Sequence, residues 1–254
     1  MNAFIAFFKK EMMESIRTYK FYILAVVFVL FGFMNPIIAK VMPDLLGSLL
    51  PDGMTITLSE PTALDAWGQF YKNGSQMGIV ILVVMFSGIM ANEFAKGTLV
   101  NILTKGMARP TVIFSKLAAA SIQWTISYLL CIVITYGYTA YFWTMAGVEN
   151  LFISLLGLWI FGELMISFVI LGGILFRSLY GSLLFTGGLV VAMTILSIFP
   201  QTSSFNPVTL STMNLALLTS GYEVSKFLSA SLVTIVGMII SIFASVVVFN
   251  KKQI

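Results

Sequence analysis

The sequence contains no histidine and only one cysteine, Cys131. A single cysteine cannot form an internal disulfide, and zinc sites and acid–base sites depend largely on Cys and His, so these absences exclude disulfide scaffolds, cysteine-cluster zinc sites and histidine-based chemistry. We expect Cys131, which lies in an apolar run, to be a small buried hydrophobic residue. Neither a catalytic residue nor a metal site is therefore expected in this chain.

Charged residues are also scarce. They make up 9% of the chain, against about a quarter in a typical soluble domain. Hydrophobic residues make up 59%, and the mean hydropathy is +0.99. So few charged groups could not cover the surface of a soluble protein, and the composition therefore indicates a polytopic all-α membrane protein.

The apolar residues are gathered into runs that are long enough to cross a bilayer, which takes roughly 20 mostly apolar residues per helix. Six such runs predict six transmembrane helices, at Phe21–Val41, Gly74–Ala91, Leu117–Phe142, Leu151–Phe176, Gly181–Phe199 and Phe227–Phe249. No repeat and no soluble domain interrupts them, so we expect residues 1–254 to form one transmembrane domain.

Lys and Arg are unevenly distributed between the two sides of these spans. One side holds only Lys40, Lys72 and Lys226, and all the other basic residues fall on the side of the two termini. By the positive-inside rule, both termini and the stretch 91–116 are cytoplasmic. The expected location is the plasma membrane, and the resemblance described below implies a bacterial one.

The first 20 residues predict an amphipathic helix in the cytoplasmic interface. Its apolar residues recur at intervals of three and four and so share one face: Phe4, Phe8, Met12, Ile16 and Tyr19. On another face, Lys10 and Glu14 are spaced for an i,i+4 ion pair. The helix either only leads into the first span or also borders a cytoplasmic partner.

Two longer polar stretches, 42–73 and 200–226, form the expected outer loops. In the first, Thr62 and Asp65 are spaced for a helix N-cap. The aromatic residues that follow, Trp67, Phe70 and Tyr71, favour a short helix at the outer interface. The second loop has an apolar middle, Leu210–Leu218, that is too short to cross the bilayer. This pattern fits a re-entrant or interfacial helix pair before the last span, or an ordinary folded loop.

Glu163 is the one acid that falls inside a predicted span. A charge at that depth costs several kcal/mol unless it is paired, hydrated or protonated, so the side chain should face the bundle interior or a cavity. It either lies on a substrate path or at a gate, or it holds two helices together by a hydrogen bond. Glycines nearby favour close helix contacts: Gly157, Gly162, Gly172 and Gly173.

The stretch 91–116 lies between the second and third spans and carries four basic residues, namely Lys96, Lys105, Arg109 and Lys116. Its first part can form a short helix, and Gly97 predicts a bend there. Arg109-Pro110 predicts a turn into the next helix. A charged anchor would explain the lysines alone, whereas a docking element would also explain the length of the stretch and its helical pattern.

The same stretch resembles the first cytoplasmic loop of the type-two permeases of ATP-binding-cassette (ABC) exporters. That loop runs from a Glu through Gly-Thr and a hydrophobic helix to an Arg, then to a Lys that enters the third span. The matching positions here are Glu93, Gly97-Thr98, Leu99–Leu103, Arg109 and Lys116. One departure is Ser115, where a glycine often precedes the lysine. The amphipathic lead-in, the six spans and the segment before the last span extend the resemblance over the whole chain.

The resemblance implies that the stretch is a coupling helix that docks into a separate ATPase. Its coupling residues would be Glu93, Phe94, Lys96, Gly97, Thr98, Leu99 and Arg109. Glu93 and Thr98 would anchor the loop by hydrogen bonds, while Phe94 and Leu99 would fill the ATPase groove. Two ATPase subunits and a second permease, either another copy of this chain or a similar chain, would complete the transporter. The chain lacks a GxxxxGK[ST] loop, so it would bind no cofactor itself, and ATP and Mg would sit on the partner.

Three other classes of protein compete with this interpretation. An intramembrane enzyme would need His or paired intramembrane Asp, and neither is present. A secondary transporter driven by an ion or proton gradient would use Glu163. A scaffold or immunity membrane protein would transport nothing. For an exporter, the aromatic and Met-rich interior favours an amphipathic or hydrophobic cargo, for which membrane-active peptides are a candidate. No nucleic-acid partner is expected.

Overall fold

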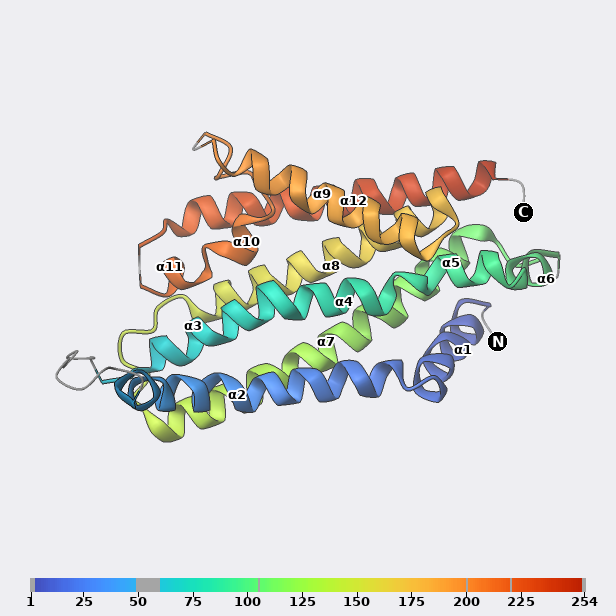
Figure 1. The fold of residues 1–254 in the computed structure, drawn as a ribbon. Helices are drawn as coiled ribbons and strands as arrows, with labels where there is room; N and C mark the ends of the chain where they lie inside the picture. Colours follow the sequence, from blue (N-terminus) through green and yellow to red (C-terminus); the bar gives the residue numbers. More distant parts are fainter. Residues whose placement is uncertain (1–2, 49–59, 105, 200, 220, 253–254) are drawn as a thin grey trace.

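The computed structural model describes residues 3–48, 60–104, 106–199, 201–219 and 221–252. These residues form helices and connecting turns, with no strand among them (Figure 1). The elements are α1 (Ala3–Arg17), α2 (Lys20–Ser48), α3 (Ala63–Asn73), η1 (Gly74–Gly78), α4 (Ile79–Phe86), α5 (Gly88–Ala95), α6 (Thr98–Thr104), α7 (Arg109–Phe142), α8 (Leu151–Phe176), α9 (Leu179–Leu196), α10 (Thr209–Thr212), α11 (Asn214–Leu218) and α12 (Val224–Lys251).

Six helical segments are long and apolar enough to cross a membrane, as the sequence predicts. They are α2, the run from α3 to α5, α7, α8, α9 and α12. The fourth span coincides with its prediction, Leu151–Phe176. The third begins at Arg109 rather than Leu117, with Pro110 in its first turn. The chain is therefore an all-α integral membrane protein with six spans.

The second span begins earlier than the sequence suggests, which corrects the outer-loop boundary at 42–73. The Thr62–Asp65 cap is confirmed, since the Thr62 backbone N–H donates to Asp65 Oδ2 at 2.8 Å. The helix then continues through the π-helical turn η1 into the bilayer, over Ala63–Ala95. Trp67, Phe70 and Tyr71 are consequently buried in the bundle and do not rest at the interface. They pack inside because α3 lies against α2, α7 and α11.

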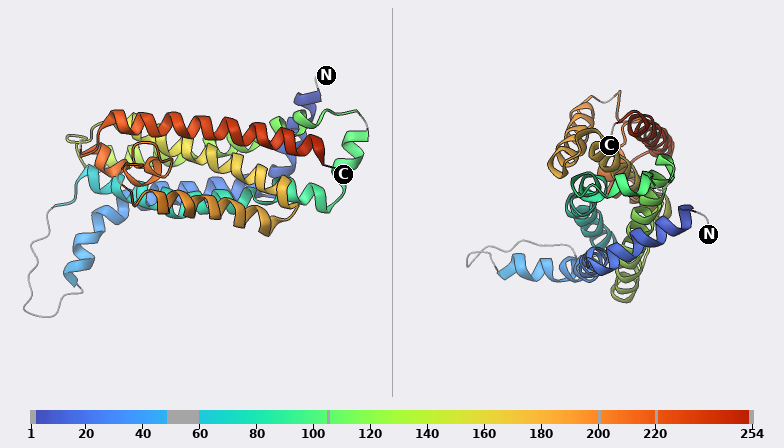
Figure 2. Two further views of the ribbon diagram at one scale, coloured as in Figure 1. Left: turned by 90° about the horizontal axis from the view of Figure 1, so that it is seen from above. Right: turned by 90° about the vertical axis from the view of Figure 1, so that its right-hand side faces the viewer.

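Helix α8 lies at the centre of the bundle, and most of its residues are buried. The glycines of α8 let its neighbours approach closely, as the sequence predicts. A Cβ on Gly162 would lie 2.5 Å from the Trp124 ring of α7, and one on Gly157 would lie 2.4 Å from the Phe227 ring of α12. Helices α9 and α12 sit on one side of α8, with α2 and α7 on the other (Figure 2). The outward faces of α2, α9 and α12 remain largely exposed.

At one end of the bundle, the segment before the last span forms two short helices, α10 and α11. Both pack against α8, with α11 also against α3 and α10 also against α12, and Leu210, Leu217 and Leu218 are buried there. The helix pair predicted for the second outer loop is thus present. Neutral hydrogen bonds hold this end of the bundle together, for example from Asn73 Nδ2 to Asn35 Oδ1 at 2.8 Å.

The two chain termini lie together at the opposite end, with α1, α5 and α6 (Figure 1). Helix α1 confirms the predicted lead-in and meets α2 at a corner where Tyr19 has φ of 60°. The face of α1 that is buried against the bundle carries Phe7, Glu11 and Ser15. The apolar face expected from the sequence is only partly covered, which suits a helix at a membrane surface.

Candidate functional site

The predicted docking stretch forms the turn from α5 into α6. Gly97 has φ of +64°, a left-handed conformation that favours glycine, so the predicted bend is confirmed. Glu93 and Phe94 lie in the last turn of α5, and Thr98 and Leu99 open α6. The structure therefore brings together all of the predicted coupling residues except Arg109, which begins α7 beyond the loop.

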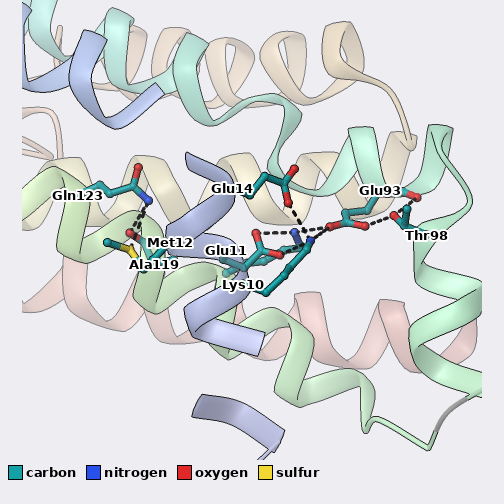
Figure 3. A network of polar contacts seen from close by, with 9 residues as sticks. Lys10, Glu11, Met12, Glu14, Glu93, Thr98, Ala119 and Gln123 are labelled. Atoms are coloured by element: carbon teal, nitrogen blue, oxygen red, sulfur yellow. Dashed lines mark hydrogen bonds and ion pairs between the residues drawn. The ribbon is translucent and has the colours of Figure 1, made fainter. Parts of the chain in front are cut away.

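A network of buried ion pairs joins this turn to α1 and α7 (Figure 3). Lys116 of α7 is only 1% exposed, and its Nζ lies 2.8 Å from Glu11 Oε2 and 3.0 Å from Glu93 Oε1. Lys10 Nζ lies 2.7 Å from the same Glu93 oxygen. Lys10 also pairs with Glu11 and, as predicted from the i,i+4 spacing, with Glu14, each at 2.9 Å. We call Lys10, Glu11, Glu14, Glu93 and Lys116 the charge cluster.

Glu93 is the residue that ties α6 to this cluster. Thr98 Oγ1 donates to Glu93 Oε2, while Glu93 Oε1 faces the two lysines (Figure 3). A carboxylate that accepts bonds from α1, α6 and α7 fixes the start of α6 relative to both helices. Glu93 and Thr98 therefore anchor the loop by a hydrogen bond within the chain.

The pKa values of Lys10 and Glu14, two of the three cluster residues on α1, show how the ion pairs oppose burial. Burial alone would lower the pKa of Lys10, but the hydrogen bonds that its ammonium group donates to Glu93, Glu11 and Glu14 raise it above its usual value. Burial would raise the pKa of Glu14, and the Lys10 ammonium outweighs this effect and lowers it. Both groups are therefore held in their charged forms.

The carboxylates of Glu11, Glu14 and Glu93 approach one another within 4.8 Å, a spacing that could hold a cation. The Lys10 and Lys116 ammonium groups already contact these oxygens, so the two lysines supply the positive charge that a bound cation would bring. A cavity of about 330 Å³ borders the cluster between α1, α5, α6 and α7.

One predicted docking side chain turns inward, which corrects its expected role. Leu99 is 0% exposed and belongs to the hydrophobic core, because the amphipathic α6 buries its apolar side against its own bundle. Phe94 is half-buried, with its ring 6.0 Å from that of Phe249 and the Arg177 guanidinium 5.4 Å above it. The part of Phe94 that stays accessible lines a small pocket with Val100 and Arg177, so its role in docking stays a prediction.

A different set of side chains faces outward from this loop. Its exposed residues include Lys96, Val100, Asn101 and Thr104, and Val100 is 41% exposed. We call these four residues the α6 outer face. It projects beyond the bundle at the end that holds both termini (Figure 2).

Arg109 binds within the chain. Its Nη1 donates to the Phe249 carbonyl, to Asn250 at 3.0 Å and to Lys252 at 2.7 Å. Lys252 Nζ in turn donates to the carbonyls of Ile174 and Leu175 at the end of α8. The end of α12 is thereby tied to α7 and α8, since cations satisfy carbonyls that a helix end leaves unpaired.

Glu163 lies apart from the charge cluster, at mid-span in α8. It is 7% exposed, and Ser121 Oγ of α7 donates to its Oε2 at 2.5 Å. Its Oε1 is buried without a hydrogen-bond partner in the described part of the chain. The side chain thus faces the bundle interior, as expected, and bridges two helices by one of its two oxygens.

The sequence reading missed the interior role of Glu11, Ser15 and Gln123. Ser15 of α1 donates to Gln123 Oε1 of α7. Gln123 also donates to the Ala119 carbonyl, and it lies beside the charge cluster (Figure 3). The signal was present in α1, where Phe7, Glu11 and Ser15 recur every four residues and so share a face. The partners on α7 are more than 100 residues away, and no local pattern identifies them.

Fold and site together define a polytopic helical membrane protein with a charge-linked loop at the end that holds its termini. No protein-family model matches the chain. Among curated proteins it is similar to the uncharacterized transmembrane protein YxlG of Bacillus subtilis (strain 168). The two are 24% identical over 214 residues, which cover 82% of this chain and 81% of that protein. This likeness agrees with the membrane class and names no activity.

Proposed function

We propose that the chain is the permease subunit of an ATP-driven ABC exporter, and that the α6 outer face docks into a separate ATPase. The observation that carries the proposal is a short helix held by buried ion pairs and exposed on its far side. A displacement of such a helix is passed on to the bundle, because Glu93 links the helix directly to α1 and α7.

In this mechanism, closure of two ATPases presses on α6 in each of two permease copies. The Glu93–Lys116 pair passes the movement into α7, and the Glu93–Lys10 pair passes it into α1. ATP and Mg are bound by the partner, and the permease itself performs no hydrolysis. The cargo is amphipathic or hydrophobic, such as a membrane-active peptide, and it moves outward.

The test is to purify the tagged chain from its native membrane and to assay co-purifying subunits and ATP hydrolysis together. Val100→Asp places a charge on the α6 outer face without touching the core. We expect this variant to insert normally but to lose the associated ATPase. Asn250→Asp is the matched control, since it adds the same charge to an exposed position at the same end. Loss of the ATPase in both variants, or in neither, would contradict docking through α6.

Glu163 favours a second candidate, a carrier driven by an ion or proton gradient. The observation is its buried Oε1, which lacks a hydrogen-bond partner among the described residues. Such a carrier would work in sealed vesicles under a proton gradient with no ATP present, and Glu163→Gln would stop it. Transport that needs ATP and ignores the gradient would exclude this candidate.

A further inference from the structure

The carboxyl group of Glu163 is a buried titratable group that the docking mechanism leaves without a role. Ser121 satisfies Oε2, but Oε1 has no hydrogen-bond partner, and none of the ion pairs among the described residues includes Glu163. An ionised carboxylate in the bilayer core is costly unless a cation or a proton compensates it. Glu163 therefore needs either a proton or a cationic partner at this site.

Ser121 connects this carboxyl group to a groove on the outside of α7. The groove has a volume of about 530 Å³ and runs beside Phe4 of α1, with Pro110, Phe114 and Leu117 along its wall. The wall is mostly apolar, and Phe114 is largely exposed on it. Ser121 lines the groove and also donates to Glu163. The acid thus lies one hydrogen bond behind a hydrophobic groove.

We propose that this groove and Glu163 together form an entry subsite for a cationic amphiphile that arrives sideways from the bilayer. The apolar chain lies along Phe114 and Leu117, and the ammonium group reaches Glu163 when the Ser121 hydroxyl rotates aside. Charge complementarity selects the occupant, because an ammonium supplies the partner that Oε1 lacks. A neutral amphiphile can donate a hydrogen bond to this oxygen but brings no compensating charge, and an anionic one is repelled by the carboxylate. The role of the site in export rests on the proposed function, whereas binding needs no ATPase.

The experiment uses the full chain in lipid nanodiscs and two probes, bromododecylammonium and bromododecanol. Each quenches tryptophan fluorescence when it binds near Trp124 or Trp159, which lie on α7 and α8 close to Ser121 and Glu163. We expect the native chain to bind the ammonium probe at least about tenfold more tightly than the alcohol. Glu163→Gln should abolish this preference and leave alcohol binding unchanged.

Two further variants separate charge from shape. Glu223→Gln removes an exposed acid near the start of α12 and should keep the native preference. Phe114→Ala should weaken both probes equally. The proposal is overturned if the native chain shows no preference for the ammonium, a result that does not depend on any variant folding. It is also overturned if Glu163→Gln keeps the preference, since Glu163 would then only hold Ser121.

The outcome is separable from that of the docking proposal. If the preference depends on Glu163 but no ATPase co-purifies, the subsite stands and the ATP-driven exporter fails. If an ATPase depends on Val100 but the ammonium preference is absent, the exporter stands and the subsite fails.

Discussion

Lys116 is the residue on which the charge cluster depends most. It is nearly fully buried between Glu11 and Glu93, so Lys116→Met leaves carboxylates in the protein interior with less compensation. Removal of one partner of a buried ion pair costs about 3–5 kcal/mol in general. We therefore expect this variant to lower the free energy of unfolding in detergent by about 3 kcal/mol.

The matched control is Lys226→Met, which breaks the exposed Lys226–Glu223 pair. An exposed pair contributes no more than about 1 kcal/mol, so the unfolding transition should barely move. Equal decreases in the free energy of unfolding in the two variants would show that burial does not strengthen the ion pairs of Lys116.

Glu14 predicts how the attachment of α1 depends on pH. Its pKa is lowered from 4.5 in the folded protein, so its contribution to stability is present above about pH 4.5 and is lost as the pH falls through the lowered value. The pKa of Lys10 is raised above 10.5, so its contribution is complete below that pH and is lost only as the pH rises through the raised value. Between these limits both contributions should be constant.

The measurement compares the melting temperature of the native chain with that of Glu14→Gln. The difference should be constant from about pH 6 to about pH 9 and should shrink below about pH 4.5. A difference that grew in acid would refute this assignment of charges.

Among the elements, the end of α12 depends on Arg109 for its order. Arg109 donates to three backbone carbonyls at the end of α12, those of Phe249, Asn250 and Lys252. Arg109→Ala should let this end fray, and hydrogen exchange in residues 246–252 should speed up by about tenfold, the equivalent of one lost charge-assisted bond. The exposed Arg17 supplies the control, since Arg17→Ala should leave that peptide unchanged. Unchanged hydrogen exchange in Arg109→Ala would show that the end of α12 stays ordered without the Arg109 side chain.

The same elements show how far local patterns reach. The six spans, the Thr62–Asp65 cap and the Gly97 bend could all be read from the sequence, because each depends on neighbouring residues. The early start of the second span could not, because the aromatic segment after Thr62 is polar enough to suggest an interface. Its burial depends on contacts of α3 with α2 and α7, which are distant in sequence.

The candidate site divides in the same way. The Glu93–Thr98 bond joins residues five apart, and a motif captures it. The Glu11–Lys116 pair joins residues 105 apart, and only the packing of α1 on α7 brings them together. The sequence predicts a contact of Leu99 with a partner protein, and this prediction is wrong. An apolar residue in a polar loop can face either its own core or another protein, and the sequence alone does not distinguish these two environments.

At the scale of the whole molecule, an even number of spans places both termini on one side. Cysteines introduced by K9C, N101C and K251C should be shielded from a membrane-impermeant maleimide on intact cells, whereas E60C and K226C, at exposed positions outside the described spans or at their outer end, should react. Permeabilised cells provide the control, since all five should then react. Cys131 should give little background, as it is 3% exposed, which confirms its expected burial. Equal labelling of K9C and K226C on intact cells would contradict the six-span topology.

The corner at Tyr19 has a mechanical consequence. Tyr19 is 68% exposed and holds a left-handed backbone, which costs an L-amino acid about 1–2 kcal/mol. The lysine–carboxylate contacts that hold α1 against the bundle keep this strained corner between α1 and α2 in place. Any change that breaks these contacts also lets Tyr19 leave the left-handed conformation. Helix α1 should therefore detach from the bundle in one cooperative step.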